Sequence, residues 1–303
     1  MLVGGVDAGG TKTECIIYDT EKEKVITRTL AGPANFQTAG IDKSCQEIKK
    51  ALEKALQNIG KTQNKISLLG IGMAGAGRKN DKRKMKEKLN ELSGVKEIHL
   101  TDDGMIALMG ATGGEKGIII TAGTGSIAYG LREDGKVVRS GGWGPLIGDE
   151  GGGFWLGIQA VKKAVKASGG RANPTELTQI VKSFFELKKL TELIPFIYSQ
   201  ELQRRQIASL APEVIKLAQR GDSTALKIIH KGITELSLLV LSVKERLDYR
   251  ETKVAFNGGL FTNEYYSNLF KEKMEKDHGL TVYKPEYSAT RGAVFYALNK
   301  YKS

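Results

Sequence analysis

Cysteine, histidine and long apolar runs are scarce in this chain of 303 residues. The two cysteines, Cys15 and Cys45, lie apart, which fits a reducing compartment and argues against a disulfide scaffold. The histidines His99, His230 and His278 are also scattered, so they predict neither a catalytic triad nor a metal site. No apolar run has the length of a membrane span, and no basic segment followed by an apolar stretch predicts a secretory leader. We therefore expect a cytoplasmic protein with no membrane partner.

A net charge of +12, from 46 basic and 34 acidic residues, is the one compositional feature that suggests a nucleic-acid partner. The densest basic segment, residues 78–88, also contains Asp81 and Glu87, and Met85 and Leu89 recur at helical spacing. We interpret this segment as an amphipathic helix with a solvated face, so no nucleic-acid partner is expected. The positive charge still favours the approach of an anionic nucleotide.

Two glycine-rich loops carry the first functional signal. The first follows the apolar run at residues 2–6 and reads Asp7-Ala8-Gly9-Gly10-Thr11-Lys12-Thr13. An acid at a strand end, then glycines and threonines, suits a β-hairpin turn whose N–H groups and hydroxyls face phosphate while the carboxylate holds Mg²⁺. An ordinary hairpin turn is the alternative. A second loop of similar composition, Thr121-Ala122-Gly123-Thr124-Gly125-Ser126, favours the phosphate interpretation. Neither of the two loops has the spacing of a P-loop.

Further segments complete a pattern, none of them specific alone: Gly32-Pro33-Ala34-Asn35, Asp102-Asp103-Gly104, Gly141-Gly142-Trp143-Gly144, Gly148-Asp149-Glu150-Gly151, Gly221-Asp222 and Gly258-Gly259. Together and in this order, they make the chain resemble the actin/Hsp70/sugar-kinase superfamily over its whole length. Within it, the chain is similar to the N-acetylglucosamine kinase and BadF/BadG/BcrA/BcrD-type ATPase family. The resemblance implies an α/β fold of two ribonuclease-H-like (actin-like ATPase) domains with an interdomain cleft. We expect an N-terminal domain of residues 1–107 plus 289–303, and a C-terminal domain of residues 108–288 with helical additions.

The order of the expected elements fits a duplicated fold, although no repeat is obvious by residue identity. Residues 2–31 should form three strands, and an amphipathic helix should follow at 42–59. The chain should become mostly helical after residue 153. The remaining elements are expected as strands at 66–73 and 95–100 around a basic helix, a helix from 104, β-structure at 118–130, helices at 155–167, 174–185, 201–218 and 223–247, a strand at 253–256, a helix at 263–276, a strand at 281–283 and a helix from 289.

One motif is a decoy. Gly70-Ile71-Gly72-Met73-Ala74-Gly75 matches the dinucleotide-binding pattern G-x-G-x-x-G after a strand. No apolar helix start follows it, because the next residues are glycine-rich and charged, and no strand ending in an acid lies at the required distance. We therefore expect no Rossmann site here.

Phosphoryl transfer to an alcohol needs a carboxylate that accepts the hydroxyl proton. Asp102 and Asp103 stand where the strand at 95–100 gives way to the helix at Gly104. An aspartate in this place is commonly a helix N-cap. The family's catalytic aspartate matches Asp103, so the resemblance implies Asp103 as the base, with Asp102 in reserve. Either could cap the helix while its neighbour catalyses.

The segment 141–153 combines many glycines with Trp143, Asp149 and Glu150. Carboxylates for hydroxyls and an aromatic ring for the apolar C–H face suit a pyranose sugar. Core burial of Trp143 and a turn-forming role for Asn35 are the alternatives. The resemblance implies sugar contacts from Asn35, Asp103, Gly142, Trp143, Gly144 and Asp149.

The resemblance also assigns nucleotide contacts. It implies that Thr11 and Thr124 contact ATP and that Asp7 is the carboxylate on the Mg²⁺ side. The bare backbone at Gly258 and Gly259 suits adenine, although an ordinary strand-to-helix turn is the alternative. The full set of expected ATP contacts is Gly9, Gly10, Thr11, Lys12, Thr124, Gly125, Ala208, Gly258, Gly259 and Asn263.

The expected function is that of a kinase using ATP and Mg²⁺ to phosphorylate the 6-hydroxyl of a hexose or amino sugar, most simply N-acetylglucosamine. Glucosamine, N-acetylmuramate, glucose and mannose stay open because a few pocket side chains decide between them. The alternatives are a broad-specificity hexokinase or N-acetylmuramate kinase of the same fold, a sugar sensor, and a BadF-type activator of a dehydratase. The activator needs interface cysteines for an iron–sulfur cluster, which the positions of Cys15 and Cys45 disfavour. The resemblance also implies a homodimer.

Overall fold

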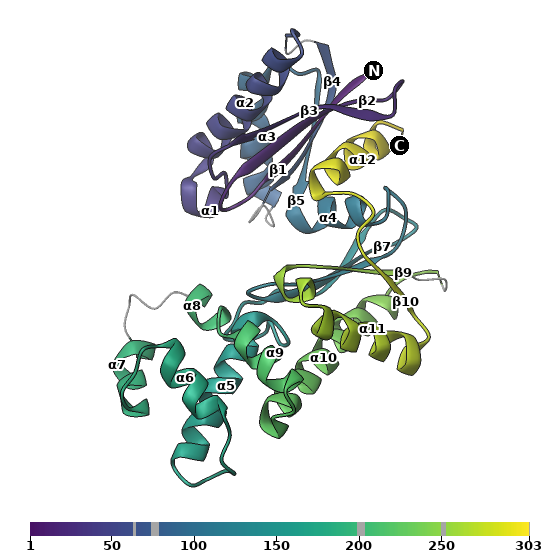
Figure 1. Ribbon diagram of the computed structural model, residues 1–303. Coiled ribbons are helices and arrows are strands. Elements are labelled where there is room, and N and C mark those ends of the chain that lie inside the picture. Colours follow the sequence, from purple (N-terminus) through teal and green to yellow (C-terminus); the bar gives the residue numbers. More distant parts are fainter. Residues whose placement is uncertain (63–64, 74–78, 199–203, 250–252, 303) are drawn as a thin grey trace. The chain divides into compact units, whose positions relative to one another are not determined.

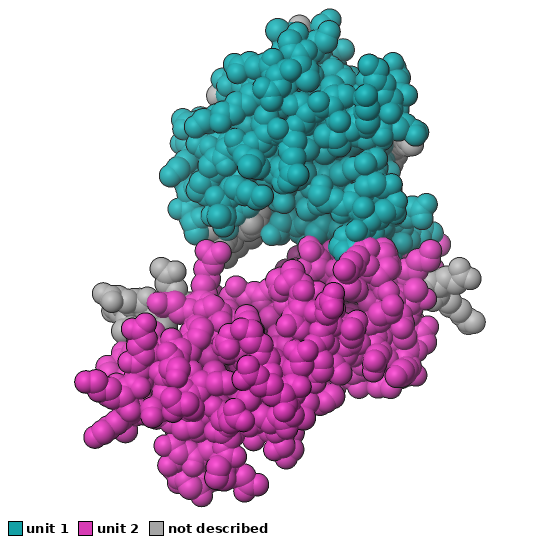
Figure 2. Space-filling model, in the orientation of Figure 1, with its two compact units in different colours: residues 1–117, 285–303 teal, residues 118–284 magenta. Residues whose placement is uncertain are grey.

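The chain divides into two compact units. The computed structural model describes all residues except 63–64, 74–78, 199–203, 250–252 and 303. Unit 1 comprises Met1–Gly117 and Pro285–Ser303, and unit 2 comprises Ile118–Lys284 (Figure 2). The expected breaks after residue 107 and before residue 289 both fall inside unit 1. The reason is that helix α4 (Asp103–Ala111) stays in unit 1, where the Gly110 carbonyl accepts a hydrogen bond of 2.9 Å from the Tyr287 N–H.

Unit 1 is built on a five-stranded sheet with the strand order β3-β2-β1-β4-β5. Strands β1, β2 and β3 pair antiparallel, whereas β4 and β5 run parallel to β1. Helices α2 and α3 cover one face and α12 packs on the other (Figure 1). The bounds are β1 (Leu2–Ala8), β2 (Thr13–Asp19), β3 (Lys24–Ala31), α1 (Phe36–Ala39), α2 (Ile41–Asn58), β4 (Ile66–Met73), α3 (Lys79–Ser93), β5 (Glu97–Asp102) and α12 (Ala289–Lys302).

Alternating side chains of this sheet supply both cores. Val6 and Cys15 face the α2 side, whereas Val3 and Ile16 face the α12 side, as the two-residue period of a strand requires. The apolar stripe predicted for the first long helix is confirmed, because α2 buries one face against the sheet. Full burial of an aliphatic side chain contributes about 1.5–3 kcal/mol, so this face anchors the helix.

Unit 2 repeats the sheet of unit 1. Its strand order is β10-β9-β6-β7-β8, with β6, β7 and β8 antiparallel and β9 and β10 parallel to β6. The duplicated fold expected from the sequence is therefore present as duplicated topology. The bounds are β6 (Ile118–Ala122), β7 (Ser126–Leu131), β8 (Val137–Gly141), β9 (Lys253–Asn257) and β10 (Thr281–Tyr283). Strand β8 was not predicted, because this short edge strand has no buried residue and so no apolar alternation.

Most helices of unit 2 lie in the two insertions between β8 and β9 and between β9 and β10. The single helix expected at 201–218 is wrong: residues 201–203 are outside the described residues, and the rest forms two helices, α8 and α9. Proline in the first turn of α9 explains the break, because it cannot continue a preceding helix. The bounds are α5 (Gly153–Ser168), α6 (Leu177–Phe184), η2 (Leu190–Glu192), α7 (Leu193–Tyr198), α8 (Arg204–Ala208), α9 (Ala211–Gln219), α10 (Ser223–Lys244), η3 (Gly259–Thr262) and α11 (Glu264–His278).

Among the residues that the structure describes, no helix combines the length and the apolar character needed to cross a bilayer.

Glycines bring α12 unusually close to the rest of unit 1. A Cβ placed on Gly5 or Gly70 would run into the main chain of α12, and one on Gly292 of α12 would run into the main chain of α4. Gly70 and Gly72 therefore serve packing inside β4, which agrees with the rejection of a Rossmann loop; Gly75 lies outside the described residues.

Replacing Gly292 with alanine tests this close contact. Alanine normally stabilises a helix relative to glycine by roughly 1 kcal/mol. Here the new Cβ would meet the Ile106 carbonyl and the Gly110 backbone, so Gly292→Ala should lower the free energy of unfolding by about 1–3 kcal/mol. Urea denaturation followed by circular dichroism measures the change. Gly169→Ala is the control, because its Cβ would meet no atom closer than 3.5 Å. Equal stability of the two variants would contradict the packing.

Candidate functional site

The acidic candidates of unit 1 lie at one edge of its sheet. Asp7 is the penultimate residue of β1, and Asp102 is the last residue of β5. In the parallel pairs, Asp7 stands opposite Gly72 and Asp102 opposite Met73, so β4 separates the two acidic strand ends. Two strand spacings place β1 and β5 about 10 Å apart. The structure therefore brings Asp7, Asp102 and Asp103 to the same carboxyl edge.

The turn between β1 and β2 lies beside Asn35. The Gly9 N–H donates to the Lys12 carbonyl at 3.0 Å, and the Gly9 carbonyl accepts from the Ala34 N–H, also at 3.0 Å. A Cβ on Gly10 would lie 3.9 Å from the side chain of Asn35. Gly10, Thr11 and Lys12 are exposed, so their polar groups are open to a ligand. Asn35 also starts α1, because its carbonyl accepts from the Ala39 N–H at 2.9 Å.

The two neighbouring aspartates have different roles in the local structure. Asp102 is the N-cap of α4, since its Oδ1 accepts from the Met105 N–H at 3.0 Å. Asp103 is the first residue of α4, and its Oδ1 accepts a hydrogen bond from the Gly104 N–H at 3.0 Å. Loss of hydration raises the pKa of Asp103, and the charge of Asp102 raises it further. Asp103 is thus a carboxylate next to the helix cap with an increased affinity for a proton.

Asp7 is held among other acids. Burial raises the pKa of Asp7 to about 6, with smaller contributions from the charges of Asp103 and Glu14 and an opposing one from Lys12. Such a carboxylate is stabilised by a cation. Within the described residues, no group of three or more histidine, cysteine, aspartate or glutamate side chains could hold a metal alone. Asp7 nevertheless fits Mg²⁺ shared with a nucleotide, because that ion needs only one or two carboxylates besides water and phosphate.

The second loop, between β6 and β7, is fixed by its main chain. The Gly123 N–H donates to the Gly125 carbonyl at 2.9 Å. The first turn of α5 also binds it: the N–H groups of Gly153 and Phe154 donate to the carbonyls of Gly123 and Thr124 at 2.8 and 2.9 Å. Thr124 is exposed. These hydrogen bonds fix the carbonyl groups of the loop, whereas the side chain of Thr124 is exposed to solvent.

Two predicted nucleotide residues lie around this loop. A Cβ on Gly153 would be 3.4 Å from the Cβ of Ala208, which places Ala208 beside the first turn of α5. Gly258 has φ 104°, and its Cβ would overlap the main chain of Ala122, so only glycine fits there. Gly259 is exposed, and a Cβ on it would meet no described atom within 4 Å. Unit 2 thus brings Thr124, Gly125, Ala208 and Gly258 to one region.

Asn263 has a structural role that the sequence did not predict. Its Oδ1 accepts from the Tyr266 N–H at 3.1 Å and caps α11. This hydrogen bond holds the start of the helix that follows Gly258 and Gly259. The expected contact between Asn263 and adenosine stays a prediction.

The glycine-rich segment after β8 surrounds Asp149. Asp149 has φ 61°, and its Oδ1 accepts from the Gly144 N–H at 3.2 Å. A Cβ on Gly125 would overlap its carboxylate, so the residue predicted for phosphate and the one predicted for sugar are in contact. Burial raises the pKa of Asp149, although the N–H groups of Gly144 and Ser126 act in the opposite direction. Backbone geometry therefore orients this carboxylate.

Trp143 lies on the surface of unit 2. It is 64% exposed, so core burial is excluded, and the Arg139 guanidinium lies 5.4 Å from the centre of its ring. Leu146 and Ile147, in the same segment, are 88% and 75% exposed. Gly142 precedes the ring with φ 71° and packs on Ile127. This segment presents apolar surface next to an oriented carboxylate, which is the chemistry that a sugar ring requires.

Sequence reasoning missed several residues of these regions. Glu14 is only 8% exposed, contributes to the electrostatics of Asp7 and forms an ion pair with Arg28. Its signal was a charged residue directly before the run Cys-Ile-Ile-Tyr at residues 15–18. The roles of Gly152 and Gly153 were also missed, because both lie against the loop at Gly123–Gly125, which precedes them by more than twenty residues. Cys15 and Cys45 are free and buried in unit 1.

Comparison with known proteins gives a consistent result. The profile of the BadF/BadG/BcrA/BcrD ATPase family matches residues 4–297. An N-acetylmuramic acid/N-acetylglucosamine kinase from Clostridium acetobutylicum is 34% identical, over 86% of both chains. An N-acetyl-D-glucosamine kinase from Dictyostelium discoideum is 30% identical, over 98% of both chains.

Solved structures confirm the fold. A protein from Chromobacterium violaceum, proposed to be an N-acetylglucosamine kinase, has a TM-score of 0.79 at 27% identity, over 98% of both chains. A ROK family glucokinase from Streptomyces griseus, in complex with glucose and AMPPNP, has a TM-score of 0.58 at 16% identity, over the whole of both chains. The predicted α/β fold with two domains of the actin-like ATPase type is therefore confirmed. Since the profile covers nearly the whole chain and two relatives reach 30% identity, the protein belongs to the BadF/BadG/BcrA/BcrD ATPase family.

Proposed function

We propose that the protein is an ATP-dependent kinase that phosphorylates the 6-hydroxyl of an amino sugar, with N-acetylglucosamine as its substrate. One observation carries the proposal: Asp102 caps α4, which leaves the adjacent Asp103 as a carboxylate of raised pKa at the sheet edge that also holds Asp7. A base with an increased proton affinity suits the removal of a hydroxyl proton.

In the proposed reaction, Asp103 accepts the proton of the primary hydroxyl of the sugar. The hydroxyl oxygen bonds to the γ-phosphorus of ATP, and the bond from that phosphorus to the β–γ bridging oxygen breaks. The products are the sugar 6-phosphate and ADP. Positioning and electrostatic stabilisation supply most of the catalysis of such a transfer.

The two glycine loops are the proposed phosphate-binding elements. Thr11 and Lys12 are exposed beside Gly9 and Gly10 in one loop, and Thr124 is exposed beside Gly125 in the other. Adenine is proposed to lie on the open backbone of Gly259, with Ala208 and Asn263 nearby. Mg²⁺, held by Asp7, would neutralise phosphate charge when bound.

Asn35, Gly142, Trp143, Gly144 and Asp149 are the proposed sugar contacts. Trp143 would cover the apolar face of the ring, and the oriented Asp149 would accept hydrogen bonds from hydroxyls. The choice of N-acetylglucosamine is supported by the activities for which the relatives from Clostridium acetobutylicum and Dictyostelium discoideum are named.

The proposal includes a homodimer in the cytoplasm, as the family resemblance implies, and two free buried thiols fit that compartment. The alternative of a dehydratase activator requires accessible cysteines for an iron–sulfur cluster. Cys15 and Cys45 are both fully buried, so this alternative is not favoured.

A panel of sugars tests the substrate. Purified protein with ATP and Mg²⁺ should release ADP with N-acetylglucosamine at the highest kcat/KM, compared with glucosamine, N-acetylmuramate, glucose and mannose. A coupled assay for ADP measures this, and phosphorus NMR identifies the 6-phosphate. A higher kcat/KM for glucose or mannose would contradict the amino-sugar assignment, and ADP release that is independent of every sugar would contradict the kinase.

Asp103→Asn should lower kcat by roughly 10²–10⁴-fold with little change in KM for the sugar, because it removes the general base and leaves the shape of the site. Asp102→Asn is the matched control. Asparagine is also a good N-cap, so this variant should keep α4 and most of the turnover. Near-normal kcat in Asp103→Asn together with a large loss in Asp102→Asn would transfer the role to Asp102.

Asp7→Asn should abolish phosphorylation and yet stabilise the fold in metal-free buffer. In the folded state the pKa of Asp7 is about 6, above the reference value of 3.8, so the folded state binds the proton more tightly than the unfolded state does. At a pH above 6, the charged form of Asp7 therefore destabilises the fold. Near neutral pH the variant should gain roughly 1–3 kcal/mol in free energy of unfolding, and the gain should shrink as pH falls through 6 toward 4. Urea denaturation at several pH values measures this. A variant less stable than the wild type near neutral pH would contradict the electrostatic argument.

A further inference from the structure

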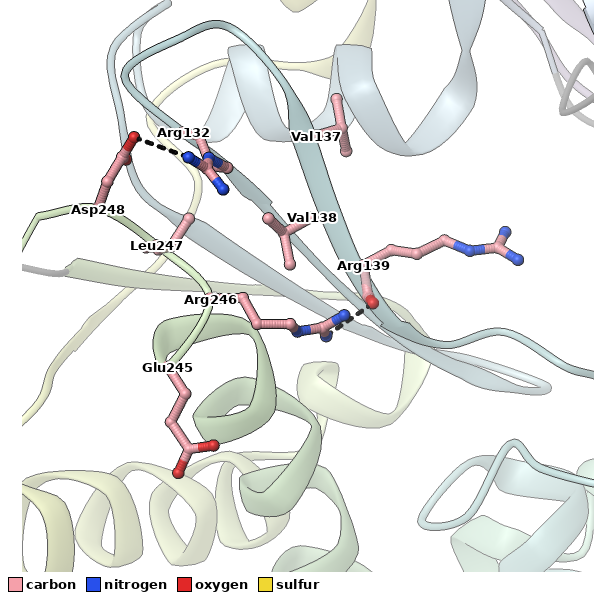
Figure 3. Close-up of a pocket in the computed structure, with 8 residues that line it drawn as sticks. All are labelled: Arg132, Val137, Val138, Arg139, Glu245, Arg246, Leu247 and Asp248. Carbon is pink, nitrogen blue, oxygen red and sulfur yellow. Dashed lines mark hydrogen bonds and ion pairs between the residues drawn. The ribbon is translucent and has the colours of Figure 1, made fainter.

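Unit 2 has a hollow that the proposed function does not use. Its volume is about 620 Å³, within the range of small-molecule sites, and it lies between the edge strand β8 and the turn that follows α10 (Figure 3). The lining residues are Arg132, Val137, Val138, Arg139, Glu245, Arg246, Leu247 and Asp248. Three of these residues are arginines and two are acids, so the charge of the hollow depends on which arginines form ion pairs.

In the described part of the chain, Arg246 donates its hydrogen bonds to neutral acceptors. Its Nε donates to the Ser242 carbonyl at 2.8 Å, and its Nη2 donates to the Arg139 carbonyl at 2.8 Å. The first of these bonds caps the end of α10, so one edge of the guanidinium has a structural role. Among the described residues, no carboxylate forms an ion pair with Arg246. Its positive charge therefore remains available to an anion in the hollow.

Arg132 is only loosely paired. Its Nη2 lies 3.6 Å from the Asp248 carboxylate and its Nε 3.4 Å from Asp134, and that buried Nε has no hydrogen-bond partner in the part of the chain that the structure describes. Asp248 is also engaged by the Glu133 N–H at 2.9 Å. Figure 3 shows the carboxylate of Glu245 pointing away from the arginines. The acids at the hollow thus leave cationic donors unsatisfied.

We propose that this hollow binds the phosphate group of a small phosphate ester. Arginine is the side chain best suited to phosphate oxygens, because its planar N–H groups donate charge-assisted hydrogen bonds. Arg246 and Arg132 supply such donors, and Val137, Val138 and Leu247 supply an apolar wall for the carbon skeleton of an ester. Free inorganic phosphate shares the charged part of this chemistry but gains nothing from the apolar wall.

The hollow is connected to the segment that carries Trp143. Arg246 donates a hydrogen bond to the carbonyl of Arg139, and β8 continues from there to Gly141, which Gly142 follows. In Figure 3 the Arg139 side chain extends away from the hollow. Its guanidinium lies 5.4 Å from the centre of the Trp143 ring. Binding of an ester to Arg246 would therefore affect the position of β8.

Isothermal titration calorimetry of the full chain without ATP, at constant ionic strength, tests the site. The probes are glucosamine 6-phosphate, inorganic phosphate and glucosamine. The wild type should bind the ester at the hollow and should bind inorganic phosphate there more weakly. Glucosamine, which has no phosphate, should not bind at the hollow. Arg246→Gln should weaken the ester-binding component by roughly tenfold or more, the scale of a lost charge-assisted hydrogen bond. Binding at the proposed catalytic site is common to all variants, so the difference isolates the hollow.

Two further variants keep the test decisive. Val137→Glu adds a negative charge at the exposed rim, where valine is 40% exposed, and should weaken ester binding as much without removing any hydrogen bond of the fold. Arg220→Gln, an exposed arginine that ends α9, is the matched control and should bind as the wild type does. Wild-type affinity in both Arg246→Gln and Val137→Glu would overturn the proposal. A change in sedimentation of Val137→Glu without any effect of the ester would do the same, and would assign the hollow to a contact between copies of the chain.

Discussion

Close contact between main chains fixes how α12 packs on the sheet and on α4 in unit 1. The position of the acidic residues depends on this contact. Helix α12 can approach β1 and β4 only because Gly5 and Gly70 lack side chains, and it approaches α4 only because Gly292 does. Asp102 and Asp103 begin α4, so their place relative to Asp7 follows from the depth at which α12 is seated. Interiors are packed too tightly to absorb extra atoms at such contacts. A residue near the carboxyl terminus of the chain, Gly292, thereby helps to position the acidic residues at the sheet edge.

Unit 2 has the same sheet topology as unit 1 but different side chains around its first hairpin. Its first hairpin has no acid in the place of Asp7, and its loop is bound instead by the first turn of α5 through Gly153 and Phe154. The carboxylate next to that loop is Asp149, which comes from the segment after β8 and is held by backbone N–H groups. Both units therefore have a glycine-rich turn after their first strand, while the acids around the two turns come from different elements.

The sequence predicted what is local and missed what depends on distant contacts. The bounds of β4 and β10 were predicted correctly, because both strands are apolar runs limited by turn residues. Both glycine-rich hairpin turns were also predicted, from the order of glycines and threonines after an apolar run. The contact between Gly125 and Asp149 was not foreseeable, because it depends on how the chain folds back after β8, a strand with no buried residue to predict it. Without the family resemblance, the residues alone could not separate Asp102 from Asp103, since either position can cap a helix. The observed hydrogen bond from the Met105 N–H shows that Asp102 is the cap.

The cap of α4 has an electrostatic consequence beyond holding the helix. Serine or asparagine at position 102 would satisfy the same N–H group, but neither would place a negative charge beside Asp103. An aspartate cap opposes the positive end of the helix, which would otherwise favour the ionised form of the next carboxylate. The choice of cap thus adds to the effect of burial on the pKa of its neighbour. A substitution at this cap alone would therefore change the protonation of Asp103 even where the hydrogen bond to the Met105 N–H is kept.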